Sequence, residues 1–376
     1  MSKRLYTVPD IYTDFKCKAG SCRRSCCLGW HITVSMEEYY RLIGLDCGPE
    51  LRRKLDGGVY MLERPTREKY AEFSKNYFGD CHMHGDDGLC ILQCLHGEDV
   101  LPSVCRYYPR SPRTIHGNEC SLSASCEGVC ELLMSKKEPI SFVEIPLEFN
   151  YSLPESVKSP VTEFYIRVRS AFIKILQNRD YSLKDRIKTV VDAAEILSEP
   201  FKKTDKALME SACEACENIA FVNTYSSLTE DAFAESVYLI KRLTERYPID
   251  KYTETVNKAS FEEYKALSED LVKNHPEYEI YMEQILVNHI FYEGFPFSEE
   301  KEDIHASCAS LIALYAVWKT ALTTCLSNDD GDESFADLTS DFYRMAENSN
   351  FDLCAAALLS ESGFFAPESL KALCEL

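Results

Sequence analysis

The feature that most constrains this chain is the crowding of its cysteines toward the N-terminus. Twelve of the 18 cysteines lie in residues 1–130, and only six lie in the remaining 246 residues. Charged residues interrupt the first 18 residues, so no secretory signal is predicted. We therefore expect a cytoplasmic protein whose thiols stay reduced. Reduced cysteines at this density favour metal binding, and a secreted disulfide scaffold is the less favoured alternative.

The charge is divided as unevenly as the cysteines. Residues 1–130 hold 17 Lys+Arg and 17 Asp+Glu, whereas residues 131–376 hold 24 against 44 and so carry the whole net charge of −20. Nucleic acids and anionic membranes are bound by basic patches, so neither is an expected partner. The longest apolar stretch, residues 306–326, is interrupted by polar residues such as Lys319. It predicts a buried or amphipathic helix, and no membrane span is expected.

Hydrophobic periodicity predicts a mainly α fold, with an irregular Cys-rich metal-binding N-terminal region packed on an α-helical bundle. The expected domains are residues 1–135 and the acidic helical residues 136–376. In the first, Ser35 and Glu38 form a capping box that predicts a helix over residues 35–43. In the second, apolar residues recur at helical spacing. The predicted helices there cover residues 162–177, 184–197, 230–246, 261–273, 277–292, 304–326, 335–346 and 351–359.

The cysteines of the N-terminal region follow a pattern that suits metal ligation. Four thiolates close a tetrahedral zinc site or hold an iron–sulfur cluster, and sulfur-only coordination suits both metals. Cys26 is followed directly by Cys27, which departs from the Cys-x3-Cys-x2-Cys of radical S-adenosylmethionine enzymes. A radical mechanism is therefore not indicated. The candidate ligands are Cys17, Cys22, Cys26, Cys27, Cys81, Cys90, Cys105 and Cys126.

These blocks resemble the flagellin lysine-N-methylase family. The resemblance begins with Tyr12-x2-Phe15-x-Cys17-x4-Cys22-x3-Cys26-Cys27-x-Gly29-Trp30. It continues with Gly88-Leu-Cys90-Ile-Leu-Gln93, Cys105-x2-Tyr108-Pro109-Arg110 and Ser121-Leu-Ser-x-Ser-Cys126. The chain departs from the family at Cys126-Glu127-Gly128, where the family usually has Cys-Pro-Glu. Weaker helical blocks carry Glu283, Asn288, Arg344 and Asn348, for which buried hydrogen bonding is favoured over a place in a cleft.

The resemblance implies an enzyme that transfers methyl groups from S-adenosylmethionine to lysine ε-amines of flagellin. It also implies a [4Fe-4S] cluster held by cysteines among the eight that match the family motif, with zinc as the alternative. A second hypothesis remains open, in which a non-catalytic zinc-binding module folds the N-terminal region while the bundle binds a protein partner. No Gly-x-Gly-x-x-Gly loop follows a strand, so the donor pocket is not expected to be a Rossmann fold.

The residues beside Cys105 are the first candidates for binding the methyl donor. Tyr107 and Tyr108 suit stacking on adenine, Arg110 suits pairing with a carboxylate, and Trp30 is a further candidate. The alternative is that these side chains only support the cysteine loops. The acidic second half suits flagellin or another lysine-bearing protein substrate, because complementary charge accelerates encounter. The alternative for that charge is solubility alone.

Overall fold

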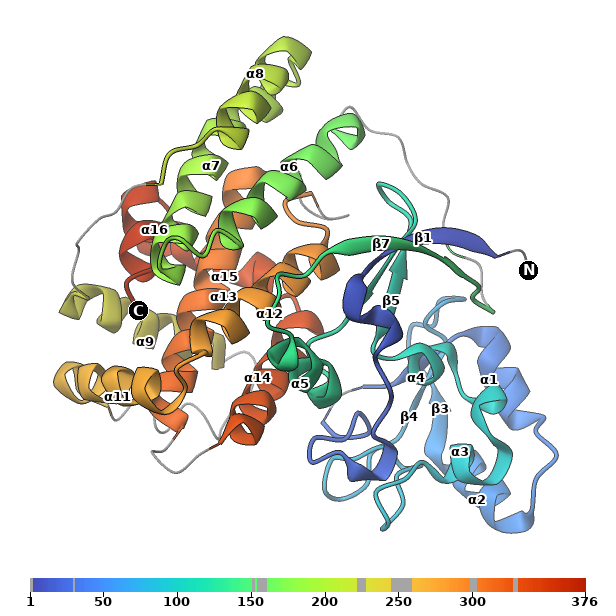
Figure 1. Cartoon of the computed structure of the whole chain (residues 1–376). Coiled ribbons are helices and arrows are strands. Elements are labelled where there is room, and N and C mark those ends of the chain that lie inside the picture. Colours follow the sequence, from blue (N-terminus) through green and yellow to red (C-terminus); the bar gives the residue numbers. More distant parts are fainter. Residues whose placement is uncertain are drawn as a thin grey trace.

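The computed structural model describes residues 3–29, 31–150, 153, 161–221, 228–244, 259–297, 303–326 and 331–376. Figure 1 shows the helices of the second half of the chain gathered on one side and the N-terminal region on the other. The sheet that contains β1 is drawn above the part of the N-terminal region that holds α1 and α4. The prediction of a mainly α fold is confirmed, and metal binding by the N-terminal region stays a prediction.

A four-stranded sheet joins the two ends of the N-terminal region. Its strands are β1 (Arg4–Pro9), β5 (Arg110–Arg113), β6 (Glu119–Leu122) and β7 (Phe142–Leu147). Their order is β5-β6-β1-β7, with β1 parallel to β6 and antiparallel to β7. Strand β1 is followed by the single turn η1 (Asp10–Thr13), whose Tyr12 and Ile11 are buried. Because β7 lies beyond residue 135, the chain after the expected domain boundary still pairs with the first strand.

A second unit is built around a three-stranded antiparallel sheet with the order β2-β4-β3. It has an apolar cluster of its own, which includes Val34, Leu42, Leu55 and Phe73. The predicted capping box of Ser35 is present. The elements of this unit are β2 (Thr33–Val34), α1 (Met36–Ile43), α2 (Pro49–Gly58), β3 (Val59–Met61), β4 (Ala71–Phe73), α3 (Ile91–His96), η3 (Glu98–Val100) and α4 (Ser103–Tyr107).

The second half of the chain is helical, as predicted. Each of the eight predicted helices is found, within the limits of the described residues, and α5, α8 and α16 are added to them. The helices are α5 (Glu127–Ser135), α6 (Thr162–Leu176), α7 (Leu183–Lys203), α8 (Lys206–Glu217), α9 (Glu230–Thr244), α11 (Phe261–Asn274), α12 (Tyr278–Glu293), α13 (Ile304–Cys325), α14 (Asp332–Glu347), α15 (Phe351–Ser362) and α16 (Pro367–Leu373).

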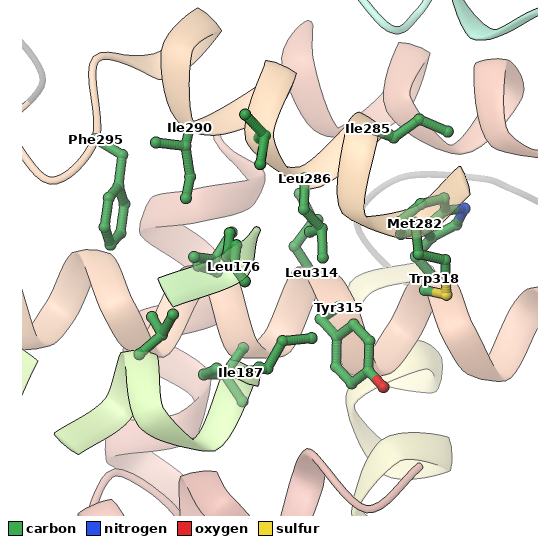
Figure 2. Packing of buried hydrophobic residues seen from close by; sticks show 14 of the residues in the cluster. Leu176, Ile187, Met282, Ile285, Leu286, Ile290, Phe295, Leu314, Tyr315 and Trp318 are labelled. Atoms are coloured by element: carbon green, nitrogen blue, oxygen red, sulfur yellow. The ribbon is translucent and has the colours of Figure 1, made fainter. Parts of the chain in front are cut away.

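Helix α13 is the centre of this bundle. It packs against α7, α9, α11, α14, α15 and α16. Figure 2 shows Leu314, Tyr315 and Trp318 of α13 among apolar side chains of neighbouring helices, such as Leu286 and Ile187. In the described part of the chain, α13 alone is long and apolar enough to cross a membrane, and 94% of its most apolar window is buried inside the molecule. The predicted buried helix is therefore found.

Candidate functional site

Four of the predicted ligand cysteines lie in one irregular loop between η1 and β2. Cys17, Cys22, Cys26 and Cys27 surround the single turn η2 (Ala19–Ser21). Gly29 ends this segment with a φ of 83°, a conformation that glycine adopts without steric cost. A loop with so little regular structure depends on contacts with the rest of the molecule for its order.

Ion pairs hold this loop against helices α5 and α14. Lys18 pairs with Glu127, whose side chain is fully buried, and lies 2.9 Å from a carboxylate oxygen of Glu131. Arg23 pairs with Glu131 at 2.7 Å and, through Nε, with Asp337 at 3.0 Å. A buried carboxylate is stable only when a nearby positive charge compensates its own charge. The basic residues of the loop supply that positive charge.

Arg344 of α14 binds the cysteine loop through its backbone. Its Nη1 donates to the carbonyl oxygens of Ser25 at 3.2 Å and Leu28 at 3.4 Å. Its Nη2 donates to those of Arg24 at 3.0 Å and Ser125 at 3.3 Å. A guanidinium group presents several donors in a fixed plane, so one side chain can hold two separate segments. Helix α14 thereby ties the loop to the segment that precedes α5.

One set of thiols, which we call the first thiol group, consists of Cys27, Cys81, Cys90 and Cys105. The backbone N–H of Cys81 donates to the carbonyl oxygen of Cys27 at 2.7 Å, and an antiparallel bridge joins Cys90 to His84. Burial raises the pKa of Cys105 well above its ordinary value, and the neighbouring thiols of Cys81, Cys90 and Cys27 act in the same direction. These four side chains therefore share one neighbourhood.

The second thiol group consists of Cys17, Cys22, Cys26 and Cys126. Burial raises the pKa of Cys126 to about 12, with Cys22 and Cys17 acting in the same direction. Burial likewise raises the pKa of Cys22 to about 11, and Cys17 contributes. Cys26 interacts electrostatically with Cys126 and also with Cys105, so it lies between the two groups. The eight predicted ligands thus form two neighbouring sets linked by Cys26, whose thiol is also hydrogen-bonded to that of Cys27.

The thiols of the two groups are not gathered into a closed metal site. Within the described ranges, no three Cys, His, Asp or Glu side chains converge closely enough to hold a metal ion as they stand. All 18 cysteines are free thiols. A hydrogen bond between the adjacent thiols lowers the pKa of Cys27 and raises that of Cys26. The donor chemistry fits a metal that binds sulfur, because metal binding removes the thiol protons, and the eight ligand assignments stay a prediction.

A cleft of about 1080 Å³ opens beside the segment that carries Cys105. Its walls come from the segments around β2 and α1, from residues 103–112, and from Asn150, Tyr292 and Asn348 of the second half. Its volume is that of a site for a cofactor-sized ligand. The predicted donor-binding residues Tyr107, Tyr108 and Arg110 all line it. The fourth, Trp30, lies outside the described residues.

Contacts with neighbouring residues hold the aromatic and basic side chains of the cleft in place. The Tyr107 hydroxyl accepts a hydrogen bond from the Asn150 N–H at 2.8 Å. The Arg110 guanidinium lies over the rings of Tyr12 and Phe15, at 5.5 and 5.2 Å from their centroids. These contacts fix the side chains that line the cleft, and both donor binding and support of the cysteine loops stay predictions for these residues.

Glu38 supplies a negative charge to the cleft wall. Its carboxylate accepts hydrogen bonds from the N–H and the hydroxyl of Ser103, both at 2.6 Å, and from the N–H of Ser35 at 2.9 Å. Burial opposes the charged form, but these hydrogen bonds outweigh it and the pKa of Glu38 is lowered. Glu38 is therefore ionised at neutral pH.

The floor of the cleft contains a serine that is backed by a buried carboxylate. Ser123 lines the cleft, and its hydroxyl donates to the Glu347 carboxylate. The Glu347 side chain is fully buried and also accepts from the backbone N–H groups of Ala124 and Ser125, both at 3.3 Å. Sequence reasoning missed this pair. Ser123 falls inside a recognised block, but nothing in the sequence links it to a residue 224 positions away.

The residues of the weaker helical blocks have different roles. Glu283 is a fully buried acid that pairs with Arg186 at 2.6 Å and Arg179 at 2.8 Å. Asn288 donates to the carbonyl oxygen of Leu122 at 2.7 Å. These two are buried hydrogen-bonding residues, as predicted, whereas Asn348 lines the cleft.

Comparisons with known proteins agree on one family. The family model described as "FliB lysine N-methylase C-terminal domain" matches residues 169–373, which are 205 of the 376 residues. Proteins named lysine-N-methylase from Salmonella choleraesuis and Salmonella typhimurium are each 25% identical over 147 residues, covering 38% of this chain and 36% of theirs. The flagellar biosynthetic protein FliU of Salmonella muenchen is 24% identical over 147 residues, covering 85% of its own length. No solved structure matches this chain.

Proposed function

Because this chain belongs to the FliB lysine N-methylase family, we propose that it is a methyltransferase that modifies lysine ε-amines of flagellin with S-adenosylmethionine as the donor. Support comes from the names of the relatives, which include two lysine-N-methylases and a flagellar biosynthetic protein. The aligned region spans about a third of the lysine-N-methylases. The activity, the donor and the substrate are therefore all parts of the proposal.

The observation that carries the proposal is the composition of the cleft. It brings Tyr107, Tyr108 and Arg110 together with Glu38 on one wall and Ser123 on the floor. S-adenosylmethionine has an aromatic base, a carboxylate and a cationic sulfonium. A cleft with aromatic faces, a guanidinium group and an ionised carboxylate offers a complementary partner for each of these three parts.

The chemistry is a direct displacement. The lone pair of a neutral lysine amine forms the new N–C bond as the S–C bond of the donor breaks, and S-adenosylhomocysteine leaves. The cleft residues bind and orient the donor, which converts an encounter in solution into a reaction between aligned groups. A lysine ammonium has an ordinary pKa near 10.4, so the site must also accept one proton before the bond forms.

We propose that four cysteines among the two thiol groups hold a [4Fe-4S] cluster, with zinc as the alternative metal. The first group offers Cys27, Cys81, Cys90 and Cys105, and the second offers Cys17, Cys22, Cys26 and Cys126. A bound metal would supply fixed thiolate ligation and so order the loop that carries four of these cysteines. A cytoplasmic location is part of this proposal, because free thiols persist in a reducing compartment.

Metal content tests the division into two groups. If both groups bind metal, Cys105→Ser removes metal from the first group and leaves that of the second, and Cys126→Ser does the reverse. Metal and sulfide analysis of anaerobically purified protein measures both. Cys47→Ser, a cysteine outside both groups, is the control. Unchanged metal in either variant contradicts the corresponding assignment.

The activity test is incubation with S-adenosylmethionine and flagellin from the same organism, followed by mass spectrometry of lysine. We expect mass increases in methyl units. Arg110→Gln should raise the KM for the donor, whereas Arg167→Gln on the outer surface of α6 should not. A metal-loaded preparation that adds no methyl group excludes the enzyme. Colourless protein with stoichiometric zinc and no activity supports the non-catalytic zinc-binding module.

A further inference from the structure

We propose that Glu347 removes, through the hydroxyl of Ser123, the proton that a lysine ammonium must lose before methyl transfer, and that His289 shares this proton. The inference rests on the proposed function and assigns its proton acceptor. It concerns residues from three parts of the chain: Ser123 after β6, His289 on α12 and Glu347 at the end of α14.

The first step is the connection between the cleft and the buried carboxylate. Ser123 lies at the cleft floor and donates to Glu347. The Tyr108 hydroxyl lies 3.1 Å from the Ser125 hydroxyl, which in turn contacts the Ser123 hydroxyl. A serine hydroxyl can give its proton to one partner while it accepts another, so either route delivers a proton from the cleft to Glu347.

The second step is the contact between the Glu347 carboxylate and the buried His289. His289 Nδ1 is 3.9 Å from Glu347 Oε1, and among the described residues no partner lies within hydrogen-bonding distance of this nitrogen. His289 is buried and also lines a cavity of about 20 Å³ beside Glu293 and Asp352. That volume suffices for about one water molecule, and the lining supplies the polar partners it needs.

The charges around His289 favour its protonated form. Burial opposes that form, but Glu347, Glu293 and Asp352 outweigh it, and the pKa of His289 is raised. The other titratable groups that face Glu347 are Tyr292 on α12, Tyr343 on α14 and Cys130 on α5. Burial raises the pKa of all three well above the ordinary values, so they stay protonated and neutral, and His289 is the neighbour that can take up a proton.

The proton balance closes without another reactant. The lysine ammonium gives one proton to the Ser123 oxygen as the Ser123 proton moves to Glu347, which leaves a neutral amine and a protonated carboxyl group. The amine takes the methyl group and becomes a methylammonium. Glu347 then passes its proton to the neutral imidazole of His289 and regains its charge, and the imidazolium returns the proton to water before the next turnover.

A structural role alone does not account for this arrangement. If Glu347 only fixed the 123–125 segment, its hydrogen bonds from two backbone N–H groups of that segment would be sufficient. It would need neither a hydroxyl that opens onto the cleft nor a buried imidazole and a water-sized cavity on its other side.

The test is the pH dependence of methyl transfer by Glu347→Gln and Ser123→Ala. At pH 7 both variants should be slower by about 10²-fold or more, the usual contribution of a positioned proton acceptor. Their rates should then rise about tenfold per pH unit toward the pKa of the free amine, while the wild-type rate changes little. Affinity for the donor, measured by calorimetry, should not change.

Ser121→Ala, the same substitution on strand β6, is the control and should keep the wild-type profile. Ser123→Ala leaves the backbone contacts of Glu347 in place, so it carries the test if Glu347→Gln does not fold. A loss that is equal at every pH, or that follows the loss of stability, overturns the inference while the proposed function stands.

A second readout does not depend on methylation. The pKa of His289, measured by NMR, should fall in Glu347→Gln, because the variant removes the charge that favours the imidazolium form. It should also fall in the charge-removing variant Asp352→Asn. An unchanged His289 pKa in Glu347→Gln overturns the pairing even if the wild-type protein transfers no methyl group.

Discussion

Some ionisable side chains of this protein are buried, and Lys319 is an example. It is buried on α13, with its ammonium group 3.9 Å from the centroid of the Tyr278 ring. Burial lowers the pKa of Lys319 to about 7, although Glu279 acts in the opposite direction. In the unfolded chain the same group titrates near 10.4. Between about pH 7 and 10 the unfolded state therefore binds more protons, and the free energy of unfolding rises with pH.

Lys319→Met should stabilise the protein at neutral pH by on the order of 2–4 kcal/mol, because the buried charge is replaced by an apolar chain of similar length. It should also flatten the rise in stability between pH 7 and 10. Urea unfolding at both pH values measures the two effects. Lys174→Met, an exposed residue on α6, should change neither. A variant less stable than the wild type at pH 7 would show that Lys319 has a polar partner that stabilises it.

At the scale of single residues, the sequence could identify candidate metal ligands and donor-binding residues. It could not show which cysteines lie together. Tyr107, Tyr108 and Arg110 could be predicted because they follow a cysteine in a recognisable block. The division of eight cysteines into two groups depends on which backbone segments bridge, such as Cys81 to Cys27, and spacing does not encode that. Glu347 could not be predicted, since an acid at the end of a helix has no pattern that distinguishes it from solvent-exposed acids.

Among the elements, α14 has a second role besides packing against α13. Its residues Asp337, Asp341 and Arg344 contact the cysteine loop, and Glu347 contacts the cleft floor. Residues that are one or two turns apart lie on the same face of a helix. A small rotation of α14 would therefore displace the loop and the cleft floor together.

Arg344→Lys tests this role. Lysine keeps the charge but cannot donate to four carbonyl oxygens in one plane, so the loop should be held less tightly. We expect metal affinity to fall about tenfold, in the range seen when residues supporting a metal site are replaced. The helical circular dichroism should not change. Arg167→Lys on α6, which pairs with Glu210 and Glu217, is the matched control. Full metal affinity in Arg344→Lys would contradict this role of α14.

The long helices of the second half were predictable because they have several turns of apolar periodicity, and some helices also have a capped start, as at Ser35 and Ser260. The strands were not. Strands β2, β3 and β4 have two or three residues each, too few to show alternation. Strand β1 pairs with β7 across more than 130 residues, and such pairing leaves no local signal.

The whole molecule combines a neutral N-terminal region with an acidic helical half. The second half carries 20 more acidic than basic residues. If this charge attracts a lysine-bearing substrate, kcat/KM for flagellin should fall as salt rises from about 10 to 150 mM, because the Debye length shortens from about 30 to 8 Å. The kcat at saturating flagellin should change little.

Initial rates at several salt concentrations measure this effect. A short lysine peptide with no net charge is the control substrate, since it gains nothing from long-range attraction. If kcat/KM for flagellin is independent of salt, the acidic half serves only solubility.

The central position of β1 also sets the order in which the protein can be completed during synthesis. Both neighbours of β1 come from residues 119–147, so the first strand leaves the ribosome long before its sheet can form. The cysteine loop follows β1 and η1, whereas Arg344 and Glu347, whose side chains contact the loop and its surroundings, lie on α14. Nascent chains therefore expose reactive thiols for most of translation. If the proposed metal binds, it can reach its final surroundings only after α14 has been synthesised.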